Sequence, residues 1–438
     1  MITKQQLIKK FLTLEMEREW FKNKHYIEAR LELFRMIEDD IFDTSYVPIF
    51  LREPLFEPSI PPSVVSKKRF LIIYSYQRII RFSNLKKTSE LGGVWDLFQN
   101  DTNEIYVDFR NSSIHYSNNE YPCTSIILET STINNSLLED IEDCFSISNR
   151  NVFSLRFAQL MGYLEKIDSL KQTINKLLDS FAPNIIFVAS YNPLFKAIIE
   201  TAKRKSIFVI EMQHGMIDRN HINYNHLFYD KDCLNKYPDM MLLFDYKSKH
   251  SARHFLSSEQ LCIVGSYINY LAHRTIQENV IAYDYLLISP TKSQIMKECA
   301  LRLREIDSHS KILYRFHPEE VVDESYISFL KSINIDIQLP KTCSVYEAIL
   351  KSKNIITYNS TVTYEALSFG KNVIVIEDDN NPAPLELINK VSVIKREEIS
   401  ISNFESKNNT SNNPEHFRKN YLVRLKKAIM NVENKIHG

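Results

Sequence analysis

Apolar residues in the first 40 positions recur at roughly helical spacing, so this stretch is predicted to form helix. Five prolines between positions 48 and 62 then predict an irregular connector. Two short runs rich in β-branched and aromatic residues, at 70–74 and 104–108, predict strands. The polar stretch at 109–150 shows no clear period. We therefore expect an N-terminal helical segment with its connector at 1–65.

Apolar runs and helical stretches alternate from residue 150 onward. The pattern predicts, in order, helix 152–181, strand 183–189, helix 193–205, strand 207–211, strand 238–244, helix 247–256 and strand 261–264. Strands that alternate with helices of about ten to fifteen residues indicate βαβ units and a parallel sheet. The pattern therefore predicts a Rossmann-like N-terminal domain at 66–275.

The alternation restarts after residue 275 and predicts a second unit of the same kind. Its strands are expected at 285–288, 311–316, 335–337, 354–357 and 372–376, with helices between them. Open parallel sheets bind ligands just outside the carboxyl ends of their strands. We thus predict an α/β protein whose two doubly wound domains, 66–275 and 276–410, face each other across a cleft. A last helix is expected within 411–438, with Asn413 as its N-cap and Pro414 at its first position.

Composition excludes several kinds of site. The chain has only 7 glycines in 438 residues, and it contains neither the G-x-G-x-x-G of dinucleotide-binding domains nor the G-x-x-x-x-G-K-[ST] of nucleotide triphosphatases. The 54 Lys and Arg residues balance the 54 Asp and Glu residues, which argues against a nucleic-acid binder. The 6 cysteines lack a C-x-x-C pair and the charged N-terminus lacks a secretory apolar region, so free thiols in the cytoplasm are expected.

The first motif directly follows the predicted strand 207–211, where residues 211–215 read EMQHG. His214 can exchange a proton near neutral pH, and Gly215 permits a tight turn or a close backbone approach. Candidate catalytic or substrate-binding residues in the same short loop are Gln213, Asp218, His221 and Tyr224. The structural alternative is a capped turn with a hydrogen-bonded histidine.

The second motif ends the strand 311–316, where residues 315–318 read RFHP. Arg315 and His317 are two positions apart, so they share one face of the strand end. Such a pair of donors suits a phosphate group, and Pro318 fixes the exit of the chain. The structural alternative is a buried strand end with an exposed arginine.

The third motif lies between the strands 354–357 and 372–376. Ser360 or Thr361 can cap the helix that begins there, and the free N–H groups of a helix N-terminus bind anions. Glu365 falls early in this helix and can bond a ribose, whereas Gly370 is expected at its C′ position. Simple N-capping is the structural alternative.

A fourth, weaker motif reads SPTKS at 289–293, where backbone N–H groups, Thr291 and Lys292 can hold a phosphate, although capping alone explains it equally well. A D-x-D triplet occurs at 230–232. Triplets of this kind are common by chance, so no metal site is expected.

Together these motifs resemble three signatures of bacterial surface-polysaccharide glycosyltransferases with the GT-B fold. The matching residues are EMQHG at 211–215, RFHP at 315–318 and STVTYEA at 360–366. These families include capsule and lipopolysaccharide enzymes such as Kdo transferases and sialyltransferases, and the CDP-glycerol glycerophosphotransferases of teichoic acid synthesis are similar in layout. The resemblance covers about residues 183–390.

The resemblance implies that the C-terminal domain holds the donor nucleotide and its phosphates. The residues implied are Arg315, His317, Ser360 and Thr361. It also implies a catalytically important histidine at His214, as in the glycerophosphotransferases. Sialyltransferases carry an acidic-acidic-Gly motif in the comparable loop, where this chain reads QHG. The identity of the base, and inversion versus retention of the sugar, therefore stay open.

The expected function is a metal-independent glycosyltransferase without cofactor. It would move a sugar from a nucleotide sugar, CMP- or UDP-linked above all, to a glycan acceptor of capsule, O-antigen or another surface polysaccharide. His214 would deprotonate the attacking hydroxyl or stabilise the leaving phosphate. The alternatives are a glycerol- or ribitol-phosphate transferase, a sugar-nucleotide 2-epimerase, and a non-catalytic GT-B scaffold of a capsule assembly complex.

The expected partners are the nucleotide sugar and an oligosaccharide or lipid-linked glycan at the inner face of the cytoplasmic membrane. No apolar stretch approaches the ~18 residues of a membrane helix. Residues of the N-terminal helix that can contact a membrane or a capsule-assembly protein are Lys9, Lys10, Phe11, Trp20, Phe21 and Lys22. Acidic residues between them favour core packing instead.

Overall fold

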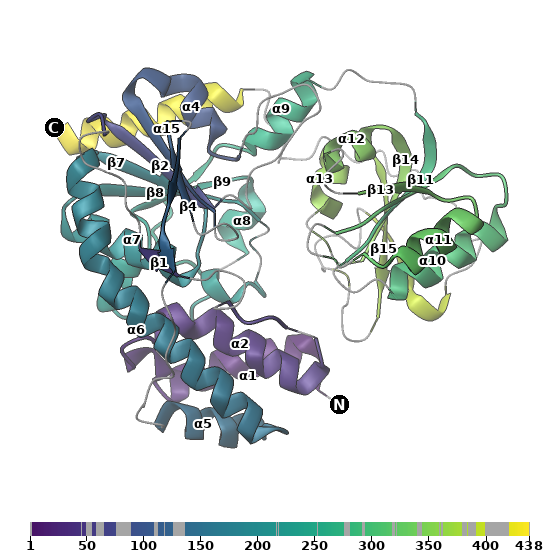
Figure 1. The fold of residues 1–438 in the computed structure, drawn as a ribbon, viewed down its shortest axis with the longest axis horizontal. Coiled ribbons are helices and arrows are strands. Elements are labelled where there is room, and N and C mark those ends of the chain that lie inside the picture. The colour runs from purple at the N-terminus through teal and green to yellow at the C-terminus, as the bar shows by residue number, and fades with distance from the viewer. Residues whose placement is uncertain are drawn as a thin grey trace. The chain divides into compact units, whose positions relative to one another are not determined.

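The computed structural model of the chain contains two compact units (Figure 1). Unit 1 comprises Met1–Ile79, Glu90–Val264 and Leu422–Gly438, and unit 2 comprises Ile80–Ser89 and Gly265–Tyr421. The structure describes residues 2–44, 46–49, 55–57, 65–75, 89–108, 113–117, 119–125, 136–215, 217, 219–251, 253–275, 281–290, 294–317, 320, 322–339, 344–358, 360, 362–378, 383, 391–398 and 420–437.

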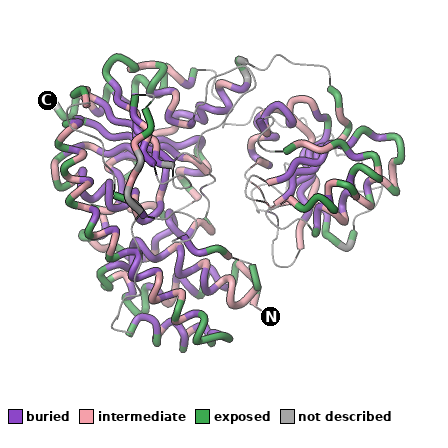
Figure 2. The backbone as a smooth tube through the Cα atoms, in the orientation of Figure 1, coloured by how far each residue is buried: buried purple, intermediate pink, exposed green. Residues whose placement is uncertain are grey.

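Unit 1 is built on an eight-stranded sheet with the order β10-β9-β8-β7-β2-β3-β4-β5. The strands are β2 (Phe70–Ser75), β3 (Thr102–Asp108), β4 (Ser113–Tyr116), β5 (Asn119–Pro122), β7 (Ile185–Val188), β8 (Phe208–Met212), β9 (Met240–Leu243) and β10 (Leu261–Ile263). From β10 to β3 all neighbours are parallel, whereas β4 and β5 add an antiparallel edge. A separate short pair joins β1 (Phe56–Glu57) to β6 (Thr124–Ser125). Figure 2 shows the central strands buried, as expected for a parallel sheet covered on both faces.

The helices of unit 1 follow the predicted alternation, although the helix predicted at 247–256 is shorter, because α8 ends at His250. They are α1 (Lys4–Glu17), α2 (Tyr26–Phe42), α4 (Gly92–Phe98), α5 (Ser136–Phe145), α6 (Arg150–Phe181), α7 (Pro193–Arg204), α8 (Tyr246–His250) and α15 (Tyr421–His437). The single helix predicted over the first 40 residues is wrong, because the chain breaks between α1 and α2. Glu19 adopts a left-handed conformation with φ 52°, and a 3₁₀ turn follows at Trp20–Lys22. The predicted N-cap at Asn413 lies outside the described residues.

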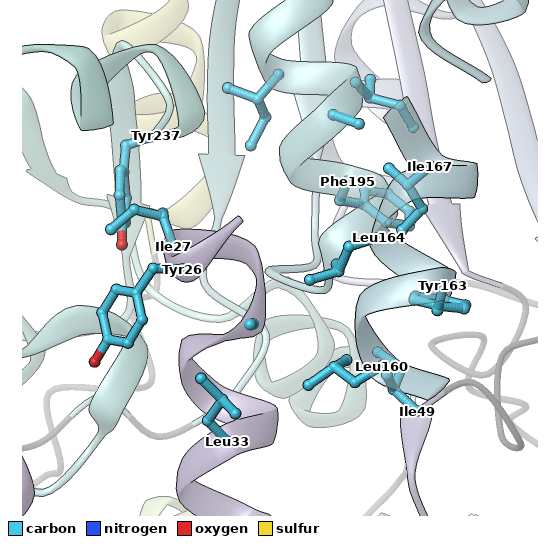
Figure 3. Close-up of a cluster of buried hydrophobic side chains, with 14 of the residues drawn as sticks. Tyr26, Ile27, Leu33, Ile49, Leu160, Tyr163, Leu164, Ile167, Phe195 and Tyr237 are labelled. Carbon is cyan, nitrogen blue, oxygen red and sulfur yellow. The ribbon is translucent and has the colours of Figure 1, made fainter. Parts of the chain in front are cut away.

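The two N-terminal helices belong to the core of unit 1. Figure 3 shows side chains of α2, α6 and α7 gathered in one apolar cluster that includes Leu33, Leu160 and Phe195. Phe11 and Trp20 are 0% and 2% exposed, and the Trp20 indole donates a hydrogen bond to Asp140 at 2.6 Å. These two aromatic side chains therefore pack in the core, as the interspersed acidic residues suggested.

A buried ion pair ties α1, α2 and the loop after β8 together. Arg30 on α2 and Glu15 on α1 are both 0% exposed, and Nη2 of Arg30 lies 2.7 Å from Oε2 of Glu15. Arg30 also donates to the backbone carbonyls of Ile222 and Asn225, and Tyr26 donates to Glu15. Burial opposes the charge, but the adjacent Glu15 carboxylate raises the pKa of Arg30, which stays protonated. A buried charge is tolerated when it is paired and hydrogen-bonded in this way.

Unit 2 is a six-stranded parallel sheet with the order β13-β12-β11-β14-β15-β16. Its strands are β11 (Tyr283–Ile288), β12 (Ile312–Arg315), β13 (Asp336–Gln338), β14 (Ser352–Thr357), β15 (Asn372–Glu377) and β16 (Ser392–Lys395). Its helices are α9 (Tyr267–Thr275), α10 (Gln294–Ile306), α11 (Glu324–Ser332), α12 (Val345–Leu350) and α13 (Val362–Ser368). Counted along unit 2 alone, the strand order is 3-2-1-4-5-6, the order of the Rossmann fold.

The predicted role of Gly370 is confirmed. Its φ is +67°, its N–H donates to the carbonyl of Leu367 at 2.9 Å, and the N–H of Lys371 donates to the carbonyl of Ala366 at 3.1 Å. These two bonds define a Schellman motif, which ends α13 and needs a left-handed residue that glycine supplies without strain.

The Arg30–Glu15 pair leads to a stability prediction. Arg30→Met leaves a buried carboxylate without its cation, so we expect it to lower the free energy of unfolding by about 3–5 kcal/mol. Arg302→Met is the matched control, because its pair with Glu305 is exposed, and it should cost less than about 1 kcal/mol. Urea denaturation of both variants measures the difference, and equal losses would contradict the role given to Arg30.

Candidate functional site

Ligands of open parallel sheets bind where the strand order reverses, at the carboxyl ends of the strands. In unit 2 this point lies between β11 and β14, which are followed by Ser289 and by Tyr358. In unit 1 it lies between β2 and β7, and Tyr191 follows β7 after a short turn. The sequence motifs thus fall at or beside the strand ends where open parallel sheets generally bind ligands.

In unit 2, the structure brings the His-Pro motif next to the end of β11. Arg315 pairs with Ile288 in the sheet, and its carbonyl accepts the N–H of Ser289 at 2.9 Å. Arg315 is 5% exposed and donates to Oε1 of Gln338 on β13 at 2.5 Å. The backbone N–H of the half-buried His317 donates to Glu320 at 3.2 Å. A buried guanidinium therefore lies at this strand end rather than the exposed arginine of the structural alternative.

Side chains of the Ser/Thr-rich motif lie at the end of β14. Ser360 accepts a hydrogen bond at 3.3 Å from the N–H of Val362, the first residue of α13. The hydroxyls of Thr357 and Thr363 lie 2.8 Å apart and join the strand end to the first turn of α13. Tyr358 donates to Asp378, after β15, at 2.9 Å.

Glu365 lies in the first turn of α13, as the sequence indicated. Tyr346 of α12 donates to its Oε1 at 2.9 Å, which fixes the half-buried carboxylate near the strand end. Five predicted site residues, by contrast, lie outside the described residues of the structure. They are Asp218, Thr291, Lys292, Pro318 and Thr361.

In unit 1, Gln213 anchors the loop that carries the His-Gly motif. Its Nε2 donates to the carbonyl of Gly215 at 2.7 Å and to Oγ of Ser248 at 2.9 Å. Its Oε1 accepts the N–H of Phe244 at 2.8 Å. Gln213 is 1% exposed, so these buried bonds hold the loop that carries His214.

His214 packs in a cluster of aromatic rings. Its imidazole is half-buried, and its centroid lies 4.8 Å from that of Tyr191. His221 and Tyr224 lie 5.2 Å and 5.8 Å from Tyr191 between ring centroids, and 4.8 Å from each other. The structure therefore brings together the three residues that the sequence predicted in one loop, and adds Tyr191 from the end of β7.

Within this cluster, the environment of His221 strongly lowers its pKa. Desolvation and the nearby charge of Arg35 lower the pKa of His221 to about 3, so this imidazole is neutral at physiological pH. Arg35 itself donates to the buried Glu32 at 3.1 Å. The sequence carried no signal for Arg35, which belongs to α2, and Tyr191 was recognisable only as a residue between a strand and a helix.

Glu211 lies one residue before the end of β8 and is 2% exposed. Burial raises the pKa of Glu211 to about 7, although the hydrogen bond from Tyr224 and the charge of Lys196 oppose the rise. Burial likewise lowers the pKa of Lys196 to about 7, and its ammonium donates to the carbonyl of Ile27 at 2.6 Å. This end of β8 is therefore a low-dielectric environment in which protonation is finely balanced.

Gly215 lies at a bend of the chain, but it shows neither a left-handed backbone nor a close contact that would require glycine. Its φ is outside the left-handed region, and a Cβ placed on it would meet no atom within 4 Å. The fold of the chain itself therefore does not require glycine at this position.

In the described part of the chain, no group of three or more His, Cys, Asp or Glu side chains is placed to hold a metal ion. In the D-x-D triplet, Oδ1 of Asp230 accepts the N–H of Asp232 at 3.0 Å, as in an Asx turn. Within the same described part, every helix is too short or too polar to span a bilayer.

No protein-family model matches the chain, and no curated protein matches it. Solved structures do match. A Listeria monocytogenes protein assigned as a UDP-N-acetylglucosamine 2-epimerase is 12% identical over 84% of this chain and 97% of its own, with a TM-score of 0.51. The S. aureus MnaA–UDP structure is 12% identical over 84% of this chain and 97% of its own, with a TM-score of 0.50. The UDP-GlcNAc 2-epimerase of Methanocaldococcus jannaschii, in complex with UDP-GlcNAc and UDP, is 16% identical over 82% of this chain and 99% of its own, with a TM-score of 0.49.

These likenesses establish the fold class. The chain is an α/β protein with two Rossmann-like, parallel-sheet units and a GT-B-like fold, as the sequence predicted. At such low identity the likeness defines the architecture, and the chemistry has to be argued from the residues of this chain.

The raised pKa of Glu211 predicts a pH-dependent stability difference. Its folded pKa, about 7, exceeds the ordinary value of 4.5, so its stabilising contribution is complete below pH 4.5 and is lost as pH rises through 7. Glu211→Gln stays neutral, so its free energy of unfolding relative to wild type should rise by about 3 kcal/mol across that window.

Urea denaturation of wild type and Glu211→Gln at a series of pH values measures this change, and other titrating groups cancel in the difference. Tyr224→Phe provides a matched comparison. This variant lacks the hydrogen bond that lowers the pKa of Glu211. The decrease in its free energy of unfolding with rising pH should therefore continue to higher pH than in the wild type. A difference that is constant with pH would refute the assignment.

Proposed function

We propose that this chain is a nucleotide-sugar enzyme, and specifically a metal-independent glycosyltransferase of surface-polysaccharide synthesis. The observation that supports it best is the clustering of the sequence motifs at strand ends. Arg315 and Ser289 meet beside the point where the unit 2 strand order reverses, and Ser360 follows the strand on the other side of that point. This is where doubly wound sheets bind nucleotides.

Unit 2 would hold the donor. With only 7 glycines in the chain, a glycine-rich phosphate loop is unavailable, so side chains must neutralise the phosphates. Arg315 and His317 would provide donors toward them, and Ser360 with Thr361 would add hydroxyls. Glu365, oriented by Tyr346, would accept hydrogen bonds from the ribose hydroxyls. Thr291, Lys292 and Pro318 would complete this side of the site.

Unit 1 would bind the glycan acceptor and supply the base. His214 would take the proton of the attacking hydroxyl, or stabilise the departing phosphate, in an orientation set by Gln213 and by ring contact with Tyr191. His221 stays neutral, so it would serve as a hydrogen-bonding group for a sugar hydroxyl rather than as a cation. Tyr224 and Asp218 are proposed to line the same loop.

A sugar-nucleotide 2-epimerase is the second candidate, and one observation favours it. The Listeria protein that shares this fold at a TM-score of 0.51 is assigned that activity, and MnaA of S. aureus, at 0.50, has a structure with UDP. A 2-epimerase must remove and return the proton at C2 and needs no acceptor, whereas a transferase turns over only when an acceptor hydroxyl is present. The two reactions are therefore separable by one substrate omission.

Nucleotide binding tests the donor site. UDP should raise the melting temperature of the wild-type protein, since a ligand that binds only the folded state stabilises it. CMP, CDP, GDP and dTDP are screened beside it. Arg315→Gln should abolish the shift, and Arg302→Gln, on the exposed surface of α10, should keep it. If none of the five nucleotides shifts the melting temperature, the donor-site proposal fails.

Turnover tests the role of His214. We expect His214→Ala to lower kcat by about a hundredfold or more, because a positioned general base contributes at least that much. His250→Ala is the control, since His250 is an exposed histidine of the same unit. UDP-GlcNAc is incubated with and without a bacterial glycan extract, and proton NMR follows the sugar. Near-wild-type turnover by His214→Ala would exclude it as the base, and a new C2 epimer without acceptor would identify the epimerase.

A further inference from the structure

The last helix, α15, has one face buried in unit 1 and one face turned outward. Leu425, Ile429 and Val432 are 0%, 0% and 1% exposed and form the inner face. Glu433 forms a salt bridge at 2.7 Å with Arg69, which precedes β2. The helix is therefore held in place by apolar packing and by one ion pair, and its outward residues are not needed for that attachment.

The outward face is strongly basic. Its exposed charged residues are Arg424, Lys426, Lys427 and Lys435. The sequence of α15 contains a single acidic residue, Glu433, and that carboxylate is half-buried and paired with Arg69. This face thus differs from the balanced charge of the chain as a whole.

Apolar side chains lie among these cations. Val423 is 68% exposed and Met430 is 47% exposed. Val423, Lys427 and Met430 are spaced i, i+4 and i+7, so they form one stripe along the helix. Exposed apolar side chains in line with lysines are typical of helices that lie at a lipid surface.

We infer that the outward face of α15 binds a membrane that contains anionic lipids. The cations would attract the headgroups, and Val423 and Met430 would enter the boundary of the acyl chains. A nucleic acid would use the charges but gain nothing from the apolar side chains. A second copy of the chain, docked through the same face, would place four cations against four cations. The basic N-terminal helix is a poorer candidate because its Phe11 and Trp20 are buried in the core.

Co-sedimentation with lipid vesicles tests this inference on the full-length protein. Wild type should bind vesicles of phosphatidylglycerol mixed with phosphatidylcholine and should bind pure phosphatidylcholine weakly. Replacing Lys426 and Lys427 by Gln should lower the partition coefficient about 30-fold, because each cation near an anionic surface contributes about a fivefold factor. Replacing Lys9 and Lys22 by Gln, an equal charge change on exposed N-terminal residues, should leave it unchanged.

A variant with Val423→Ser and Met430→Ser separates lipid from other polyanions. It should bind the anionic vesicles several-fold more weakly while it keeps the melting temperature and, if the chain is the proposed enzyme, its turnover of soluble substrate. Equal binding of wild type to neutral and anionic vesicles would overturn the inference. So would unchanged vesicle binding by this variant together with tight binding of a single-stranded DNA oligonucleotide. Neither result bears on nucleotide binding by unit 2, so the proposed function stands or falls separately.

Discussion

A buried arginine links the N-terminal helices to the loop that carries the His-Gly motif. Arg30 has no access to solvent, so its charge depends on the Glu15 carboxylate, and its remaining donors need acceptors. Two of those acceptors are backbone carbonyls of Ile222 and Asn225, in the loop after β8. The conformation of that loop, and with it the position of His221 and Tyr224, is therefore coupled to α1 and α2. A segment outside the Rossmann pattern thus supports the candidate site of unit 1.

The chemistry of the two units follows from different constraints. In unit 2 the strand order defines where a ligand of this kind of sheet is expected, and the proposed phosphate contacts come from arginine, histidine and hydroxyl groups because the chain has few glycines. In unit 1 desolvation dominates. The same burial that raises the pKa of Glu211 lowers the pKa values of Lys196 and His221, so the end of β8 holds fewer charges than its sequence suggests.

Regular elements with a strong local period were predictable from the sequence. The long helix α6, the strands β7, β8 and β9, and the strand–helix alternation of unit 2 all follow from apolar periodicity and from Pro193 at a helix start. The hairpin of β4 and β5 and the edge strand β16 were missed, because their pairing partners lie elsewhere in the chain and their own sequences are polar or short. The break between α1 and α2 was missed because Trp20 keeps the helical spacing of apolar residues while Glu19 turns the backbone.

The sequence by itself determined the fold class, the strand ends and the residues that follow them, since periodicity and the capping residues are local properties. Gly370 is an example, because its left-handed conformation follows from its place after an amphipathic stretch. Tertiary structure alone decided that Gln213 bonds to Ser248 and Phe244, that the ring of Tyr191 contacts that of His214, and that α15 packs on unit 1 across more than a hundred residues of intervening chain. Such contacts, and the desolvation that shifts the pKa of Glu211, depend on which distant residues exclude water from one another, and no local pattern encodes that.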